Sequence, residues 1–144
     1  MQKILFLLLI LTGFAKAQDL PVTSDVIQDQ STNFKICFKV DENWMVYDKV
    51  DGEDGPIPLQ IEFNNPQNIN VSNTEKPKLK SKFDDVFEVN IDYFDSNVCY
   101  NINTQKINSA QPAQITIDYT YMMCNLKTGI CLPPTSNSSN LLFK

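Results

Sequence analysis

The 144-residue chain contains no histidine and no arginine, and all twelve of its basic residues are lysines. Without histidine, the sequence excludes Ser-His-Asp and Cys-His nucleophiles, an imidazole general base, and histidine-ligated zinc or haem. Without arginine, no guanidinium is present to clamp a phosphate or carboxylate with two hydrogen bonds. Seventeen acidic residues give a net charge of −5, so we expect no nucleic-acid partner. Any reaction must use cysteines, carboxylates, hydroxyls or lysines.

The N-terminus has the pattern of a secretory signal peptide. Lys3 supplies a short positive region, an apolar run reaches Leu11, and Ala15-Lys16-Ala17 fits the small-x-small cleavage rule. The apolar run is far shorter than the ~20 residues that span a bilayer. We therefore expect residues 1–17 to be cleaved before Gln18. The mature chain would then be periplasmic or otherwise exported, with no stable membrane insertion after cleavage.

The mature chain is acidic and of single-domain size. It keeps ten lysines against seventeen acids, a net charge of −7, which argues against binding to anionic membranes or nucleic acids. Its roughly 127 residues suit one domain with one core. We expect residues 18–32 to form an N-terminal segment and residues 33–144 to form the folded domain.

Apolar and polar residues alternate along much of the chain. The alternation is regular over residues 34–40, 89–93, 98–103 and 115–120. The stretches between these segments carry turn residues, at 51–56, 64–66 and 95–97. A period of two indicates strands with one buried face. We predict an all-β fold, an immunoglobulin-like antiparallel β-sandwich of about seven to nine strands.

Export would place all four cysteines in an oxidising compartment, where an even count suggests disulfides. Cys37 and Cys99 have a spacing compatible with the inter-sheet bridge of an immunoglobulin domain. However, both lie on the more polar face of their strands, and Trp44 follows Cys37 too closely for that pattern. An inter-sheet core bridge is therefore disfavoured. Unpaired thiols, or a bridge between neighbouring strands, stay open.

Lys76, Lys78, Lys80 and Lys82 occupy every second position, so an extended strand would place them on one side. We favour a lysine-guarded sheet edge that discourages pairing with another chain. The alternative is a contact surface for an acidic partner.

Cys124 and Cys131 are separated by six residues and follow a segment rich in aromatic and methionine side chains. Gly129 lets the connection turn back, because glycine adopts positive φ without a Cβ clash. Pro133-Pro134 stiffens the exit and excludes a helix there. The two thiols can therefore meet across a compact loop.

Two interpretations of this loop stay open from spacing alone. On a loop-entropy estimate, an eight-residue ring stabilises by roughly 2.5 kcal/mol and a Cys37–Cys99 ring by roughly 4.3 kcal/mol, so the short ring is the weaker staple. A short surface disulfide is also open to attack by another protein's thiolate, which needs neither histidine nor metal. Lys127 in the loop would favour a thiolate modestly. The alternative is a structural disulfide in a non-enzymatic β-sandwich binding module.

We expect neither a cofactor nor a metal. A thiol-ligated metal is disfavoured because the histidines and the short cysteine spacing that zinc prefers are missing.

Several motifs occur in the order found in one known family. They are Trp44-Met45-Val46-Tyr47, Gly55-Pro56-Ile57-Pro58, residues 80–87, and Tyr121-x-x-Cys124 with Cys131-x-Pro133-Pro134. From about Asn33 to the C-terminus, the sequence thus resembles the N-terminal periplasmic domain of the thiol:disulfide interchange protein DsbD family. The resemblance departs in a slightly longer loop between the cysteines and in the additional Cys37 and Cys99.

The resemblance implies a thiol–disulfide oxidoreductase of the protein-disulfide reductase type. Its partners would be a membrane electron carrier on a separate chain, which feeds a thioredoxin-like donor, and periplasmic oxidoreductases that accept the electrons. Cys131 would be the sulfur that partners attack and Cys124 its intramolecular partner. An aromatic cap would shield the pair, with Phe83 and Phe87 as the candidates. The supporting loop residues would be Tyr121, Gly129, Pro133 and Pro134.

Overall fold

The computed structural model describes residues 19–29, 31–52 and 55–144. The expected signal peptide, residues 1–17, lies outside the described residues. The described chain forms eleven β-strands, all paired antiparallel. Within these residues, no helix has the length and apolar character that crossing a membrane requires.

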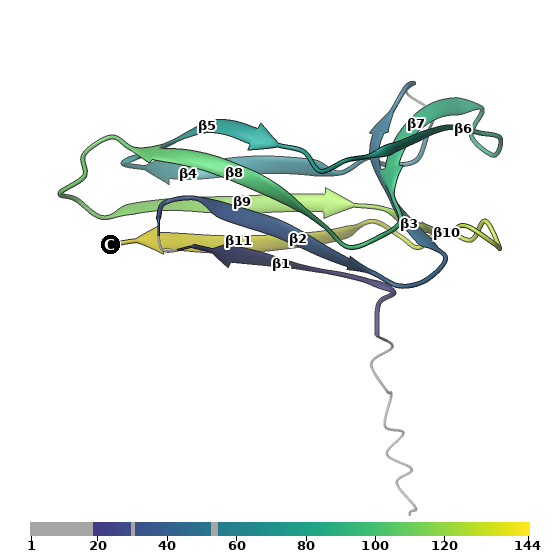
Figure 1. The fold of residues 1–144 in the computed structure, drawn as a ribbon, viewed down its shortest axis with the longest axis horizontal. Coiled ribbons are helices and arrows are strands. Elements are labelled where there is room, and N and C mark those ends of the chain that lie inside the picture. Colours follow the sequence, from purple (N-terminus) through teal and green to yellow (C-terminus); the bar gives the residue numbers. More distant parts are fainter. Residues whose placement is uncertain (1–18, 30, 53–54) are drawn as a thin grey trace, which may run out of the picture.

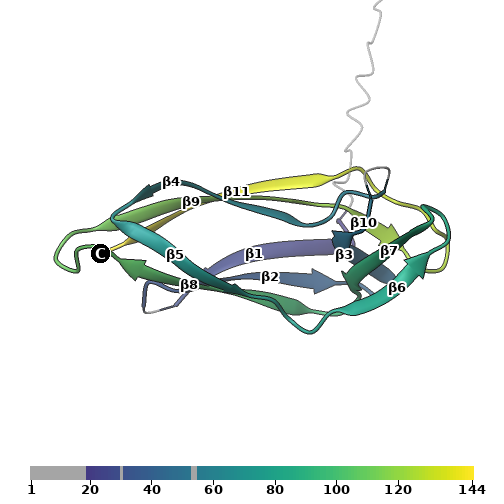
Figure 2. The ribbon, with the colours of Figure 1, turned by 90° about the horizontal axis from the view of Figure 1, so that it is seen from above.

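The strands form three sheets. The first, in the order β1-β2-β8-β5, consists of β1 (Val22–Gln28), β2 (Phe34–Val40), β8 (Val98–Lys106) and β5 (Ile69–Glu75). The second, in the order β10-β3-β7-β6, consists of β10 (Met123–Asn125), β3 (Trp44–Val50), β7 (Val89–Phe94) and β6 (Lys80–Asp84). The third, in the order β11-β9-β4, consists of β11 (Thr135–Phe143), β9 (Ala113–Tyr121) and β4 (Gln60–Gln67). The first and third sheets are the layers of a sandwich, and the second lies at one end of it (Figures 1 and 2).

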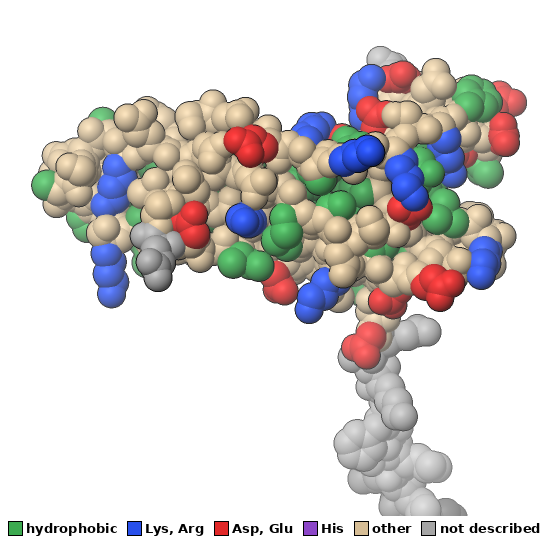
Figure 3. All heavy atoms as spheres, viewed as in Figure 1, with side chains coloured by type: hydrophobic (Ala, Val, Ile, Leu, Met, Phe, Trp, Pro, Cys, Tyr) green, Lys and Arg blue, Asp and Glu red, His purple; other side chains and the backbone are tan. Residues whose placement is uncertain are grey.

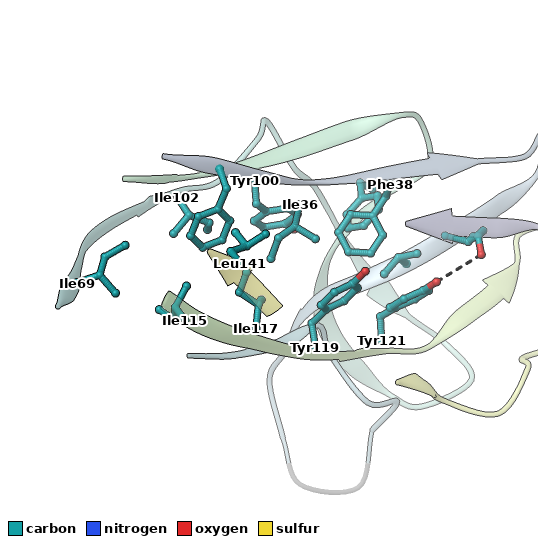
Figure 4. Packing of buried hydrophobic residues seen from close by; sticks show 14 of the residues in the cluster. Ile36, Phe38, Ile69, Tyr100, Ile102, Ile115, Ile117, Tyr119, Tyr121 and Leu141 are labelled. Carbon is teal, nitrogen blue, oxygen red and sulfur yellow. Dashed lines mark hydrogen bonds between the residues drawn. The ribbon is translucent and has the colours of Figure 1, made fainter. Parts of the chain in front are cut away.

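The main core lies between the first and third sheets. Alternate residues of β2, β8 and β9 point inward from the two layers and meet in the middle (Figure 4). Phe38 of β2 packs edge-on against Tyr121 of β9, with ring centroids 5.2 Å apart. The predicted alternation is therefore confirmed, and so is the all-β, immunoglobulin-like class.

The strands are more numerous than the expected seven to nine, because several lie where the sequence shows little alternation. One is β1, which comes from residues 18–32 and pairs with β2 along its length. The turn expected at residues 64–66 is instead a bulge within β4, where Asn65 has a φ of 50°. The chain reverses at Asn68, with a φ of 56°. Asparagine tolerates this left-handed backbone, which explains why an Asn-rich stretch supplies both the bulge and the turn.

The alternating lysines lie beside and on β6, which is the edge strand of the second sheet. Lys80 on β6 forms an ion pair with Asp95 at 2.7 Å, and Lys82 lies 5.3 Å from the centre of the Tyr93 ring. Lys76, which precedes β6 in the sequence, forms an ion pair with Asp48 at 2.8 Å. Lysine and acidic side chains are interspersed over this end of the molecule (Figure 3). These contacts favour the guarded-edge interpretation over a contact surface for an acidic partner.

Candidate functional site

Cys124 and Cys131 form a disulfide at the end of the sandwich that carries the second sheet. Cys124 lies in β10, opposite Met45 of β3, and is only 1% exposed. Cys131 forms an isolated antiparallel β-bridge with Cys124 and is partly exposed. The two sulfurs therefore belong to residues of unequal exposure.

The loop between the cysteines is closed by its own hydrogen bonds. The Asn125 side-chain oxygen accepts the backbone N–H groups of Lys127 and Thr128, each at 3.0 Å. The Asn125 backbone donates to the Ile130 carbonyl at 2.8 Å and accepts the Gly129 N–H at 2.9 Å. Because all four of these bonds use Asn125, the chain turns in a compact ring directly after Cys124.

The expected supporting residues occupy the loop and its exit. Gly129 has a φ of 70°, and a Cβ there would meet no atom within 4 Å, so the backbone angle alone favours glycine. Pro133 and Pro134 are exposed and lead directly into β11. Between Cys131 and these prolines, Leu132 packs toward the main core and donates its N–H to the Met123 carbonyl at 3.0 Å. The second cysteine is thereby tied to the sandwich.

Tyr121, in contrast, belongs to the main core. It is 1% exposed, contacts Phe38, and directs its hydroxyl to the Val22 carbonyl at 3.4 Å. It therefore supports the loop only indirectly, by fixing the end of β9.

A second apolar cluster surrounds the disulfide on the outer face of the second sheet. Its buried members are Met45, Tyr47, Ile91 and Cys124. Partly buried side chains complete it, namely Val50, Val89, Tyr93, Met122 and Cys131. A bulge in β3 between Tyr47 and Lys49 brings Tyr47 and Val50 to this same face. The disulfide is thus set in a largely apolar environment that is separate from the main core.

The turn after β6 contacts this cluster through Tyr47. Asp84 is 6% exposed, and its Oδ1 accepts the N–H groups of Val86 and Phe87 at 3.0 and 3.3 Å. Its Oδ2 accepts the Tyr47 hydroxyl at 3.3 Å. Phe87 packs edge-on against Tyr47, with ring centroids 6.5 Å apart. One carboxylate therefore ties the turn, the phenylalanine and the tyrosine together beside the disulfide.

The environment of Tyr47 keeps its hydroxyl protonated. Burial raises the pKa of Tyr47 well above its ordinary value, and the nearby Asp84 charge and hydrogen bond raise it further. The phenol consequently acts as a hydrogen-bond donor to Asp84 across the neutral pH range.

The two cap candidates occupy different faces of the second sheet. Phe83 pairs with Asn90 and is 54% exposed, next to a surface hollow of about 320 Å³ that Lys49 and Asp92 also line. Asp84, its neighbour, points to the disulfide face, so the alternation of β6 turns Phe83 away from it. Of the two, Phe87 is the one that lies against the cluster around the disulfide.

The sequence motifs do not identify the apolar residues that surround the disulfide, in particular Met45, Ile91 and Met122. They also do not indicate the role of Asp84. Met45 and Tyr47 are two positions apart on one strand, and this spacing is the sequence feature that predicts both side chains on the same face. Nothing local indicates that Asp84 bonds to Tyr47, because the two residues are 37 positions apart.

No group of three or more potential metal ligands converges in the part of the chain that the structure describes. The site consists of a disulfide, its apolar lining and an adjacent turn on an immunoglobulin-like sandwich. This combination defines a small all-β domain with a disulfide set in an apolar cluster at one end.

The comparisons with known proteins agree with that class. The family profile for the N-terminal domain of the thiol:disulfide interchange protein DsbD matches residues 14–142. The chain therefore belongs to the DsbD N-terminal domain family and is a thiol–disulfide interchange domain. No curated protein matches the sequence.

Two solved structures share the fold. The DsbD N-terminal domain of Neisseria meningitidis, in its reduced form, has 12% identity and a TM-score of 0.59, covering 84% of each chain. The second is a complex between the DsbD and PilB N-terminal domains of the same organism. Its matched chain has 13% identity and a TM-score of 0.58, and the match covers 83% of this chain and 80% of that chain. At these identities the likeness concerns the fold.

Proposed function

We propose that this chain is an exported thiol–disulfide relay that works through the Cys124–Cys131 pair. The observation that carries the proposal is the unequal exposure of the pair, with Cys124 buried in an apolar cluster and Cys131 partly exposed. This arrangement supports attack on the sulfur of Cys131, with the sulfur of Cys124 as leaving group.

Reduction of the domain takes two exchange steps. A thiolate of a dithiol donor attacks Cys131, the intramolecular S–S bond breaks, and Cys124 leaves as a thiolate that takes up a proton. The second thiol of the donor then attacks the mixed disulfide, releasing Cys131 as a thiolate. The donor becomes a disulfide, the domain becomes a dithiol, and two electrons have moved.

Delivery of the electrons reverses these roles. The Cys131 thiolate attacks one sulfur of an acceptor disulfide, the acceptor S–S bond breaks, and the other acceptor sulfur leaves as a thiolate that takes up a proton, so that a mixed disulfide is formed. Cys124 then attacks its own partner sulfur on Cys131, which re-forms the intramolecular bond and releases the reduced acceptor. Phe87, held over the cluster by Asp84 and Tyr47, limits access of unrelated thiols between encounters.

We infer that the donor is a membrane-linked thioredoxin-like protein and that the acceptors are periplasmic oxidoreductases. The family membership supports this assignment, and one structural neighbour is a complex between a DsbD N-terminal domain and a PilB N-terminal domain. The signal-peptide pattern of residues 1–17 supports export.

The experiment is a covalent trap. With Cys124→Ser, the mixed disulfide at Cys131 has no resolving thiol, so an adduct with a thioredoxin-fold partner should accumulate in a periplasmic extract. Cys131→Ser is the matched control and should trap little, because its remaining thiol is buried. If neither variant forms an adduct, or both form it equally, the relay is refuted. The alternative, a binding module braced by a structural disulfide, predicts that outcome.

A further inference from the structure

A second disulfide lies on the first sheet, outside the site described above. Cys37 of β2 and Cys99 of β8 stand directly opposite each other in the antiparallel register and are bonded, with their Cα atoms 4.1 Å apart. Cys37 alternates with the buried Ile36 and Phe38, so its side chain is on the outer face of the sheet. Both cysteines are partly exposed.

The pairing of the two strands does not depend on this bond. The β2–β8 ladder runs from Phe34 opposite Ile102 to Phe38 opposite Val98, with the cysteines in between. The inward-facing residues of both strands are buried in the main core. After reduction the ladder and the core would still hold the two thiols face to face, ready to re-form the same bond.

The surroundings of the bond admit a reacting thiol. A surface hollow of about 290 Å³ is lined by both cysteines, by Lys39 and by Asn97, so space is available beside the sulfurs. Lys35 and Lys39 flank Cys37 on the same face of β2 and are exposed, whereas Asp25 of β1 pairs with Cys37 from the other side. The two lysines outnumber this one acid, and nearby positive charge favours a cysteine leaving as a thiolate.

We propose that Cys37–Cys99 is a second thiol–disulfide exchange site, which accepts two electrons from a dithiol while the sandwich stays folded. A dithiol thiolate attacks one sulfur, the Cys37–Cys99 bond breaks, and the other cysteine leaves as a thiolate and is protonated. The second thiol of the reagent resolves the mixed disulfide. The reagent is oxidised to a disulfide and the domain gains two thiols.

The two sites differ in the strength of the reductant they need. The β2–β8 ladder keeps Cys37 and Cys99 opposite each other when their bond is open, whereas Cys131 lies outside the strands and forms only an isolated bridge with Cys124. Thiols that the folded chain holds face to face re-form their bond more readily, so a stronger reductant is needed to keep Cys37–Cys99 open. Cys124–Cys131 is therefore reduced first, and Cys37–Cys99 only by the stronger reductant.

The first test uses the mature double variant Cys124→Ser with Cys131→Ser, in which Cys37–Cys99 is the remaining disulfide. It is treated with dithiothreitol while maleimide labelling counts thiols by mass and circular dichroism follows the sheets. We expect two thiols per chain with the β spectrum intact, at a rate within about tenfold of that in denaturing urea. A native-state rate lower by about 10³-fold or more, tracking the unfolding equilibrium, would overturn the proposal.

The second test uses the wild-type chain, which decides the matter even if the double variant does not fold. Dithiothreitol is titrated, thiols are labelled, and the labelled peptides are identified. Labels on Cys124 and Cys131 should appear first and labels on Cys37 and Cys99 later, before the sheets melt. If labels on Cys37 and Cys99 appear only when the sheets melt, the proposed second exchange site is refuted. Because the double variant lacks both relay cysteines, its outcome is independent of the proposed relay.

Discussion

Phe87 lies edge-on against Tyr47, and the hydroxyl of Tyr47 is bonded to the same carboxylate, Asp84, that holds the backbone of Phe87. The tyrosine belongs to the apolar cluster that contains Cys124. The covering turn and the disulfide are thereby connected through two aromatic rings and one acid.

Removing the Phe87 ring should expose the disulfide. With Phe87→Ala, we expect reduction of Cys124–Cys131 by a small dithiol to become several times faster, with a loss of stability of about 1–2 kcal/mol because the ring is only partly buried. Stopped-flow reduction and urea unfolding measure the two effects. Phe83→Ala is the matched control, since that ring is 54% exposed on the other face and its loss should leave the rate unchanged. Equal acceleration by both variants would remove Phe87 from the role of cap.

Asp84 should act through Phe87. Asp84→Ala leaves the Tyr47 hydroxyl and two backbone N–H groups without their acceptor, so we expect a loss of about 1–3 kcal/mol and faster reduction of Cys124–Cys131. Combined with Phe87→Ala, the effects on the rate should be less than additive, because both changes open the same turn. Asp85→Ala is the control, because Asp85 is exposed. Strictly additive rate effects would show that the two residues act separately.

Gly129 should influence the equilibrium of the bond. An alanine at its φ of 70° costs about 1–2 kcal/mol of backbone strain, which the reduced loop can relieve by relaxing. Gly129→Ala should therefore make the midpoint potential of Cys124/Cys131 less negative by about 20–40 mV. Gly129→Asn should shift it less, because asparagine tolerates the left-handed region. An unchanged potential in Gly129→Ala would mean that the loop keeps its backbone after reduction.

Alkaline pH should weaken the fold through its buried tyrosines. Burial raises the pKa of Tyr100 and of Tyr47. Asp48 and Asp84, which accept hydrogen bonds from these hydroxyls, raise the two pKa values further. The folded state thus holds these protons more tightly than the unfolded chain, whose tyrosines ionise near pH 10. The resulting stability is fully present below about pH 10 and declines above it.

Urea midpoints at increasing pH measure this decline. The Tyr100→Phe variant is less stable at neutral pH, because Asp48 loses a bond of 2.5 Å, but its midpoint should fall less steeply above about pH 10. Parallel curves for the wild type and this variant would contradict a linked proton at Tyr100.

Much of the architecture could be predicted from sequence because alternation reports directly on a buried face. The inward residues of β2 and β9 alternate as the sequence indicates, and they make the main core. The cysteine loop is also recognisable, because glycine tolerates a positive φ and proline fixes its own φ. These sequence features are local, so the structures they predict can be identified without knowledge of the tertiary structure.

Other features depend on strand register, which the sequence does not encode locally. The choice between unpaired thiols and a neighbouring-strand bridge for Cys37 and Cys99 required the β2–β8 pairing, which places them opposite each other. The choice between Phe83 and Phe87 required the direction in which Asp84 points. The bulge in β4 differs from the turn that the sequence predicts there, because an asparagine-rich composition is typical of both.

The most direct test of the relay is the midpoint potential of the Cys124/Cys131 couple. It should be measured in the mature chain with Cys37→Ser and Cys99→Ser, so that a single couple titrates against a thiol–disulfide buffer. We expect a potential above about −300 mV, with reduction complete while the chain stays folded. A potential below that value, or thiols that appear only when the sandwich unfolds, would contradict it and leave the disulfide as a structural brace.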